Sequence, residues 1–173
     1  ETKNLKWKTN IPGKGHATPV VWEDKIIVQT AIETDEISPE APETLGEGSR
    51  MAPNQTNLIH EFKVLLVDRN TGNILWETMV NREWPQENTH ELGSWASNSP
   101  CTDGERIYAY FGSRGIYCLD FDGTIIWQRD FGQMQKHMSF GEGSSPYLYK
   151  DKLFILWDHE GDSYLFALNK NTG

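Results

Sequence analysis

The sequence predicts an all-β fold: part of a β-propeller, with about three blades of four antiparallel strands each. Three observations lead to this prediction. A strand–turn–strand motif that ends in tryptophan recurs along the chain, a Ser-Pro or Thr-Pro pair recurs in phase with it, and apolar residues at helical spacing are missing. Self-similarity at about 45–50 residues, with four short strands in each unit, is typical of a propeller blade.

The clearest copy of the motif covers residues 66–76. Asp68 can hydrogen-bond the backbone of its own turn, and Gly72 supplies the positive φ that the turn requires. Trp76 follows the turn at a fixed distance, and its large ring can fasten the hairpin to a neighbouring element. We therefore predict that Asp68 and Gly72 form the turn and that Trp76 is a structural anchor.

The motif returns further along the chain, in residues 118–127 and again from residue 167. The second copy is one residue shorter and has Asp120 and Gly123 in its turn and Trp127 as its anchor. The third copy extends to its glycine, Gly173. Three copies of one motif favour a repeat architecture over a single irregular β-sheet.

The spacing of these markers places the blades. Trp76 and Trp127 are 51 residues apart, and the prolines of Ser99-Pro100 and Ser145-Pro146 are 46 residues apart. Each such pair, like Thr18-Pro19, precedes a short strand, a turn and an apolar strand. Residues 5–8, with Trp7 as anchor, are expected to form the outer strand of a preceding blade. The predicted blade limits within a single propeller domain over residues 1–173 are 1–8, 16–80, 95–130 and 144–173.

One segment interrupts the repeat. Residues 33–59 mix acidic residues with proline and glycine, and the 69 residues between Trp7 and Trp76 exceed the other tryptophan spacing by 18. We interpret residues 33–59 as an insertion loop. A loop of this length is either functional or mobile, and its composition favours a mobile loop over one that becomes ordered on binding.

The number of strands falls short of a closed propeller. Outside the insertion, the repeats supply the last strand of one blade, two full blades and three strands of another. Propellers usually close with four to eight blades. We therefore expect the 173 residues to be part of a longer propeller that is completed by its remaining blades or by a second copy of the chain. The alternative is a small protein that closes by oligomerising.

Charge and cysteine content exclude several classes of protein. A formal net charge of −9 disfavours partners such as nucleic acid and anionic membrane surfaces. No apolar run is long enough for a membrane span, and no signal peptide is recognisable. Cys101 and Cys118 fall on the first and third strands of one blade, about 9–10 Å apart. This separation is too large for a disulfide, so we expect two buried thiols.

The candidate ligand site comes from the segments that lead into the first strand of each blade. Such loops gather on one face of a propeller, where ligands usually bind. They contain His16, Trp95, Asn98 and Glu142, which we predict as candidate ligand-binding residues. The alternative is that the polar residues of these segments only bond backbone groups beside a narrow channel.

No catalytic residues and no metal site are predicted. His16, His90 and His137 lie in equivalent loops, but none of the five histidines has the spacing of a metal-binding motif. The sequence also lacks a Gly-x-Ser-x-Gly elbow and a glycine-rich phosphate loop.

The pattern Asp-x-x-Thr-Gly-x-x-x-Trp at residues 68–76 resembles the pyrroloquinoline-quinone-type (PQQ-like) β-propeller repeat. Residues 5–8 and 16–22 resemble the first blades of secreted bacterial propellers with this repeat. The resemblance covers nearly the whole chain except residues 33–59. It implies a propeller fold and a periplasmic or extracellular bacterial location.

Two functions follow from the fold and the resemblance. The first is a non-catalytic cell-envelope propeller without a cofactor, acting as a scaffold that binds protein or carbohydrate. The alternative is a fragment of a pyrroloquinoline-quinone-dependent dehydrogenase with quinone and calcium. Dehydrogenases of that fold are expected to carry two adjacent cysteines, a tryptophan and acidic or amide calcium ligands. This sequence has no adjacent cysteines, and none of its residues matches the calcium ligands.

Overall fold

A computed structural model describes residues 3–45, 54–136 and 140–173. In this part of the chain the secondary structure consists of eleven strands and one short 3-10 helix, η1 (Gly112–Arg114). The strands are β1 (Val20–Trp22), β2 (Lys25–Ile37), β3 (Leu58–Asp68), β4 (Ile74–Glu83), β5 (Cys101–Thr102), β6 (Arg106–Tyr110), β7 (Ile116–Asp120), β8 (Ile125–Arg129), β9 (Tyr147–Tyr149), β10 (Lys152–Trp157) and β11 (Tyr164–Asn169).

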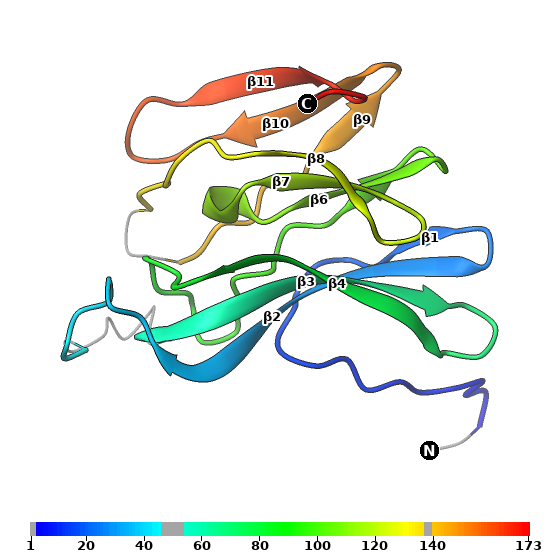
Figure 1. The fold of residues 1–173 in the computed structure, drawn as a ribbon, viewed down its shortest axis with the longest axis horizontal. Helices are drawn as coiled ribbons and strands as arrows, with labels where there is room; N and C mark the ends of the chain where they lie inside the picture. The colour runs from blue at the N-terminus through cyan, green and yellow to red at the C-terminus, as the bar shows by residue number, and fades with distance from the viewer. Residues whose placement is uncertain (1–2, 46–53, 137–139) are drawn as a thin grey trace.

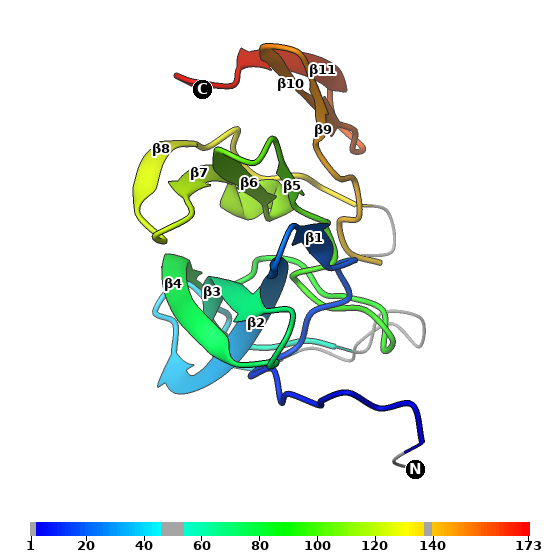
Figure 2. The ribbon, with the colours of Figure 1, turned by 90° about the vertical axis from the view of Figure 1, so that its right-hand side faces the viewer.

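The strands form three antiparallel sheets, and each strand pairs with the next one along the chain. The orders are β1-β2-β3-β4, β5-β6-β7-β8 and β9-β10-β11. The sheets stack face to face in chain order, with the N-terminal sheet at the bottom of Figure 1 and the C-terminal sheet at the top, and Figure 2 shows the same stacking from the side. Stacked four-stranded meanders are propeller blades, and the predicted all-β, partial-propeller fold is confirmed.

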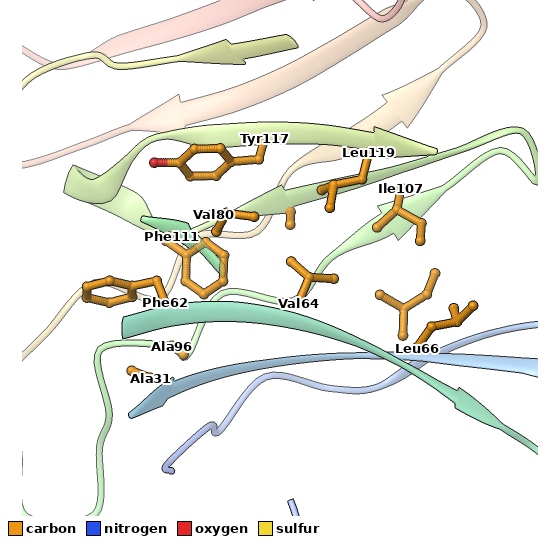
Figure 3. Close-up of a cluster of buried hydrophobic side chains, with 12 residues drawn as sticks. Ala31, Phe62, Val64, Leu66, Val80, Ala96, Ile107, Phe111, Tyr117 and Leu119 are labelled. Atoms are coloured by element: carbon orange, nitrogen blue, oxygen red, sulfur yellow. The ribbon is translucent and has the colours of Figure 1, made fainter. Parts of the chain in front are cut away.

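The middle sheet is buried on both faces, which explains its nearly continuous apolar sequence. Alternate residues of β6 and β7, such as Ile107 and Leu119, pack against Val64 and Leu66 of the first sheet (Figure 3). The residues between them, such as Tyr108 and Cys118, pack against the third sheet. The two-residue period of a strand thus supplies two hydrophobic cores from one sheet.

An outer contact repeats three times: twice between consecutive sheets, and once between the N-terminal segment and the first sheet. The indole N–H groups of Trp7, Trp76 and Trp127 donate to backbone carbonyl oxygens at 2.9, 2.9 and 3.0 Å. The acceptor is in each case the second residue of the β-turn in the following sheet: Arg69, Phe121 and Lys170. Trp76 and Trp127 thus each connect their own hairpin to the following sheet.

The turn glycines complete this contact. Gly72, Gly123 and Gly173 have positive φ values of 79°, 86° and 77°. A Cβ atom on these glycines would lie 2.6, 3.0 and 2.8 Å from the indole rings of Trp7, Trp76 and Trp127, respectively. Glycine is required here both for the backbone conformation and for the close approach of the ring.

An inner contact repeats at the Ser-Pro and Thr-Pro pairs. The backbone N–H of Thr18 donates to Ser99 Oγ at 2.9 Å, and the backbone N–H of Ser99 donates to Ser145 Oγ at 2.9 Å. The serine before each proline thus accepts a bond from the preceding blade. The two markers found in the sequence are the outer and inner fastenings between blades.

The first sheet differs from the others in length, and this corrects the predicted insertion. β2 has 13 residues and β3 has 11, whereas β6 and β7 have 5 each. Residues 33–37 and 58–59 are strand, so the expectation of a loop over residues 33–59 is wrong at both ends. The acidic residues of β2 are accommodated because they are exposed or paired: Glu36 forms a 2.6 Å ion pair with Arg82 of β4.

The connection between β2 and β3 is anchored where the structure describes it. Ser38 N–H donates to the carbonyl of Asn57 at 2.9 Å, and Trp84 Nε1 donates to the carbonyl of Thr56 at 2.7 Å. Its centre, residues 46–53, lies outside the described residues, so the predicted mobility of the loop stays a prediction.

Residues 5–8 do not form the predicted strand. They lie outside all three sheets, since a strand needs a neighbouring backbone to pair with. In the turn after β3, the Asp68 carboxylate accepts hydrogen bonds from the backbone N–H groups of Asn70 and Thr71 at 2.9 and 2.7 Å. Asp120 does the same for Asp122 and Thr124.

Both cysteines are free thiols; Cys118 is buried as predicted, whereas Cys101 is half-buried. Cys101 of β5 and Cys118 of β7 both pair with Tyr108 of the intervening β6. Burial raises the pKa of Cys101 to about 12 and that of Cys118 to about 11. Neither thiol is a nucleophile near neutral pH, because the thiolate is the reactive form.

Candidate functional site

The topology separates long connections from tight turns. The connections 38–57, 84–100, 111–115, 130–146 and 158–163 all leave the sheets at one end, which we call the loop face (left in Figure 1). The tight turns between β1 and β2, β3 and β4, β5 and β6, and β7 and β8 lie at the opposite end, the turn face. All four candidate residues predicted from the sequence lie in segments that enter a sheet from the loop face.

Glu142 belongs to a buried ion pair beneath the loop face. Its side chain is 8% exposed, and that of Arg114, on η1, is 2% exposed. Glu142 Oε1 lies 3.4 Å from Arg114 Nη1, and its other oxygen accepts the backbone N–H of Ser113 at 2.6 Å. The Ser113 hydroxyl donates to the same carboxylate. Glu142 is thus fully engaged inside the protein.

The other nitrogen atoms of the Arg114 guanidinium lie close to Gln86 and Glu83. Gln86 accepts a hydrogen bond from Nη2, and Glu83 Oε1 lies 3.4 Å from Nε. The Nε atom makes no hydrogen bond of good geometry despite this short distance. The ring of Phe62 lies 5.9 Å from the guanidinium carbon. Burial raises the pKa of Glu83, and Arg114 opposes that shift.

Asn98 and His16 lie elsewhere. Asn98 is 1% exposed and donates through Nδ2 to the carbonyl of Ser144 at 2.5 Å, which ties the segment before β5 to the segment before β9. His16 is exposed, and its backbone N–H donates to the carbonyl of Ala96 at 3.1 Å. With Lys14 and Glu91, it lines an open hollow of about 390 Å³.

Trp95 forms the wall between two cavities. It shares a small cavity with Arg114 and Glu142 on one side, and a pocket of about 320 Å³ on the other. Its indole N–H donates to the carbonyl of Glu87 at 2.7 Å, so only ring carbons are left for further contacts. The structure therefore brings Trp95 and Glu142 to one cavity and places Asn98 and His16 apart from it.

Sequence reasoning missed His60, which is 2% exposed and lies against Trp95, with ring centroids 4.6 Å apart at 66°. His60 occupies β3 two residues before Phe62, on the side of the strand that faces the middle sheet. Two-residue alternation through His60, Phe62 and Val64 was the signal that could have found it. Burial lowers the pKa of His60.

The pocket of about 320 Å³ gathers His60, Glu33, Lys14 and Trp95 with Ser94 and backbone of Gly13. These residues come from the segment before β1, from β2, from β3 and from the segment before β5. No sequence motif links them, because each pair is brought together only by the register of the first sheet and the packing of the second against it.

Within the described residues, no group of three or more His, Cys, Asp or Glu side chains is arranged to hold a metal ion. His137, one of the three loop histidines, lies outside the described residues. No helix in the described part of the chain has the length and apolar character to cross a membrane.

Stacked four-stranded meanders, joined by tryptophan–turn contacts in each repeat, define a β-propeller of the PQQ-like repeat class. The sequence model for the family described as outer membrane protein assembly factor BamB matches residues 60–173, well over half of the chain. The chain belongs to this family, and the predicted resemblance to PQQ-like repeats is confirmed.

One solved structure is similar to part of the chain. BamB from Moraxella catarrhalis is 14% identical, with a TM-score of 0.39 over 85% of this chain and 49% of that chain. The chain thus spans about half the length of that protein. No curated protein sequence matches the chain.

Proposed function

We propose that this protein is a non-catalytic β-propeller of the bacterial cell envelope that binds other proteins as a scaffold in outer membrane protein assembly. The observation that carries the proposal is the family match over residues 60–173. A periplasmic location follows from the same role. Of the two ligand classes predicted from the sequence, protein is favoured by the family description.

The frame suits a scaffold because its sheets are fastened at both edges. Trp76 and Trp127 fix the outer strands, and the Ser99 and Ser145 hydroxyls fix the inner ones. A frame held in this way presents its loops without large rearrangement, which lowers the entropic cost of binding.

The loop face carries the apolar side chains that a protein partner would cover. Leu92 is 75% exposed, Ile37 63%, Leu45 43% and Phe140 41%. Ile37 ends β2 at this face, and Leu45, Leu92 and Phe140 lie on three of the connections there. Exposed apolar residues with a polar surround are typical of protein-binding surfaces. We therefore propose the loop face as the docking surface.

Site-specific photo-crosslinking tests the proposal. A photoreactive amino acid replaces Leu92 on the loop face or, as the matched control, Asp122 in a tight turn on the opposite face, in the natural full-length protein inside its own bacterium. We expect adducts with outer membrane assembly proteins from position 92 and few from position 122. Equal labelling from both positions, or adducts only with proteins outside the envelope, contradicts the proposal.

The alternative function is that of an enzyme, a quinone-dependent dehydrogenase, rather than a non-catalytic scaffold. The described residues do not fit the quinone–calcium group, because Cys101 and Cys118 lie on strands separated by β6 and no acidic cluster of ligands is present among them. Addition of pyrroloquinoline quinone and calcium to the full-length protein distinguishes the two functions. Stoichiometric quinone absorbance retained through gel filtration favours the enzyme, and its loss favours the scaffold.

A further inference from the structure

The pocket beside Trp95 has an unusual pair of hydrogen-bond acceptors. His60 Nδ1 lies 3.1 Å from the carbonyl oxygen of Leu58. A carbonyl only accepts, so Nδ1 carries the ring proton, and Nε2 of the neutral ring is a bare acceptor. Nε2 lies 3.7 Å from Glu33 Oε2, which is also an acceptor. The Thr56 hydroxyl donates to the same carboxylate oxygen at 3.3 Å, and no proton lies between that oxygen and Nε2.

This arrangement favours a ligand that places a hydrogen-bond donor in the pocket. A group that donates to both atoms satisfies His60 Nε2 and adds a hydrogen bond to the Glu33 carboxylate, which can accept several. The bond to the carboxylate is strengthened by its charge. Hydroxyl groups and ammonium groups both qualify. Protonation of His60 itself is disfavoured because its ring is buried.

The other walls of the pocket favour hydroxyls over a cation. Lys14 lines the same pocket and repels a second positive charge. Ser94, which is 3% exposed, also lines the pocket, and its hydroxyl is hydrogen-bonded to the backbone N–H of Ala96 and to the Ser97 hydroxyl. Trp95 offers ring carbons only, because its N–H is bonded to Glu87. The pocket therefore has an aromatic wall beside hydrogen-bond donors and acceptors. This combination suits a ligand ring with apolar C–H faces and hydroxyl groups along its edge.

We propose that this pocket binds a neutral sugar ring, either a free monosaccharide or the end of a glycan. Neighbouring ring hydroxyls donate to His60 and Glu33, Lys14 donates to a further hydroxyl, and the C–H face lies against Trp95. The volume of about 320 Å³ is that of a small-ligand site. The inference is independent of the assembly role, and either one can fail alone.

NMR titration of the protein with D-glucose tests the site through the ring signals of His60 and the indole signals of Trp95. We expect both sets of signals to shift saturably, with a dissociation constant in the millimolar range. Maltotriose serves as the second probe: binding at least as tight as that of glucose indicates a glycan end, and weaker binding indicates a free monosaccharide. Both outcomes support a sugar site.

Glu33→Gln is the decisive variant, because it removes the charged acceptor and its amide N–H₂ can donate to His60 Nε2 in place of a ligand hydroxyl. Glu33 is 55% exposed, so the variant is expected to fold. We expect glucose binding to weaken about tenfold or more. Asp35→Asn, an exposed carboxylate two residues along the same strand and outside the pocket lining, is the matched control and is expected to bind as the wild type does.

Three results overturn the proposal: no saturable shift with either sugar, equal affinity in Glu33→Gln and the wild type, or a stronger response to tetramethylammonium than to glucose. The last result assigns the pocket to a cation instead.

Discussion

Among single residues, Glu142 shows how a residue that looks like part of a ligand site can serve stability. Its carboxylate accepts from Ser113 and pairs with Arg114, and both charged side chains are almost fully buried. Removing one partner of such a pair leaves an uncompensated buried charge, which usually costs more than the pair contributes. Glu83 remains near Arg114 and limits that cost.

We therefore expect Glu142→Ala to lower the free energy of unfolding by about 3 kcal/mol in urea denaturation. Glu105→Ala, which removes an exposed carboxylate from a turn, is the control and is expected to change it by less than about 0.5 kcal/mol. If both variants unfold like the wild type, Glu142 does not hold Arg114 in place and a ligand-binding role for it regains support.

A second prediction concerns His60 and the pH dependence of the free energy of unfolding. Burial lowers the pKa of His60 from its ordinary value near 6.5, with Arg114 and Lys14 adding to the shift and Leu58 and Glu33 opposing it. As the pH falls below about 6.5, the unfolded chain takes up a proton that the folded chain resists. The free energy of unfolding therefore falls with decreasing pH, by at most about 1.4 kcal/mol per pH unit for this one group.

Comparison with His60→Gln isolates the effect. Burial raises the pKa of Glu83 and Glu87, and these groups change stability in the opposite direction at lower pH. Their contribution is present in both proteins and cancels in the difference. We expect the wild type to lose stability faster than His60→Gln between pH 7 and pH 5.5 in thermal melts. Parallel curves are the result that contradicts a buried neutral imidazole.

At the scale of elements, Trp76 and Trp127 stabilise the contacts between consecutive sheets. Trp76 donates to Phe121, and its ring lies under Gly123 of the next turn. We expect Trp76→Ala and Trp127→Ala each to lower the free energy of unfolding by about 3–5 kcal/mol, the usual cost of truncating a large packed aromatic side chain. Trp127 is buried and Trp76 is half-buried. Leu75→Ala, at a 51% exposed neighbour on β4, is the control and is expected to be nearly neutral. If both tryptophan variants have the same denaturation midpoint as the wild type, the prediction that Trp76 and Trp127 are structural anchors is wrong.

Elements set by local chemistry were predictable from the sequence. The turn at Asp68 and Gly72 needs particular side-chain bonds and a particular φ, and both are visible in a short motif. The extension of β2 to Ile37 was missed, because its acidic residues resembled a loop. Glu36 is stable there because Arg82, 46 residues away, pairs with it across the sheet.

The candidate site was less predictable for the same reason. Glu142 and Trp95 were found because they lie beside the repeated Ser-Pro markers. His60 and Glu33 come together through strand register, since Glu33 of β2 pairs with His60 of β3. Lys14 joins them through a bridge to Ala31. Such contacts between residues far apart in the sequence cannot be predicted from the spacing of residue types along the chain.

At the scale of the whole molecule, the hydrophobic cores of the described residues each join one sheet to the next along the chain. One hydrophobic core joins the first and second sheets, and a separate core joins the second and third. Stability in such arrays is approximately a sum of unit and nearest-neighbour terms. The third sheet depends on the second through Trp127, Leu153 and Ile155, and it has no part in the core that contains Phe62 and Val64.

This arrangement predicts that loss of one join loosens one end of the molecule. In Trp127→Ala, the indole bond to Lys170 and the contact with Gly173 are absent. We expect amide hydrogens of β10 and β11 to exchange about tenfold to a hundredfold faster than in the wild type, while those of β3 keep their protection. Trp76→Ala is the internal comparison, since it loosens the join between the first two sheets instead. Uniform acceleration across all three sheets in Trp127→Ala means that the array unfolds as one cooperative unit, and the nearest-neighbour description is then wrong.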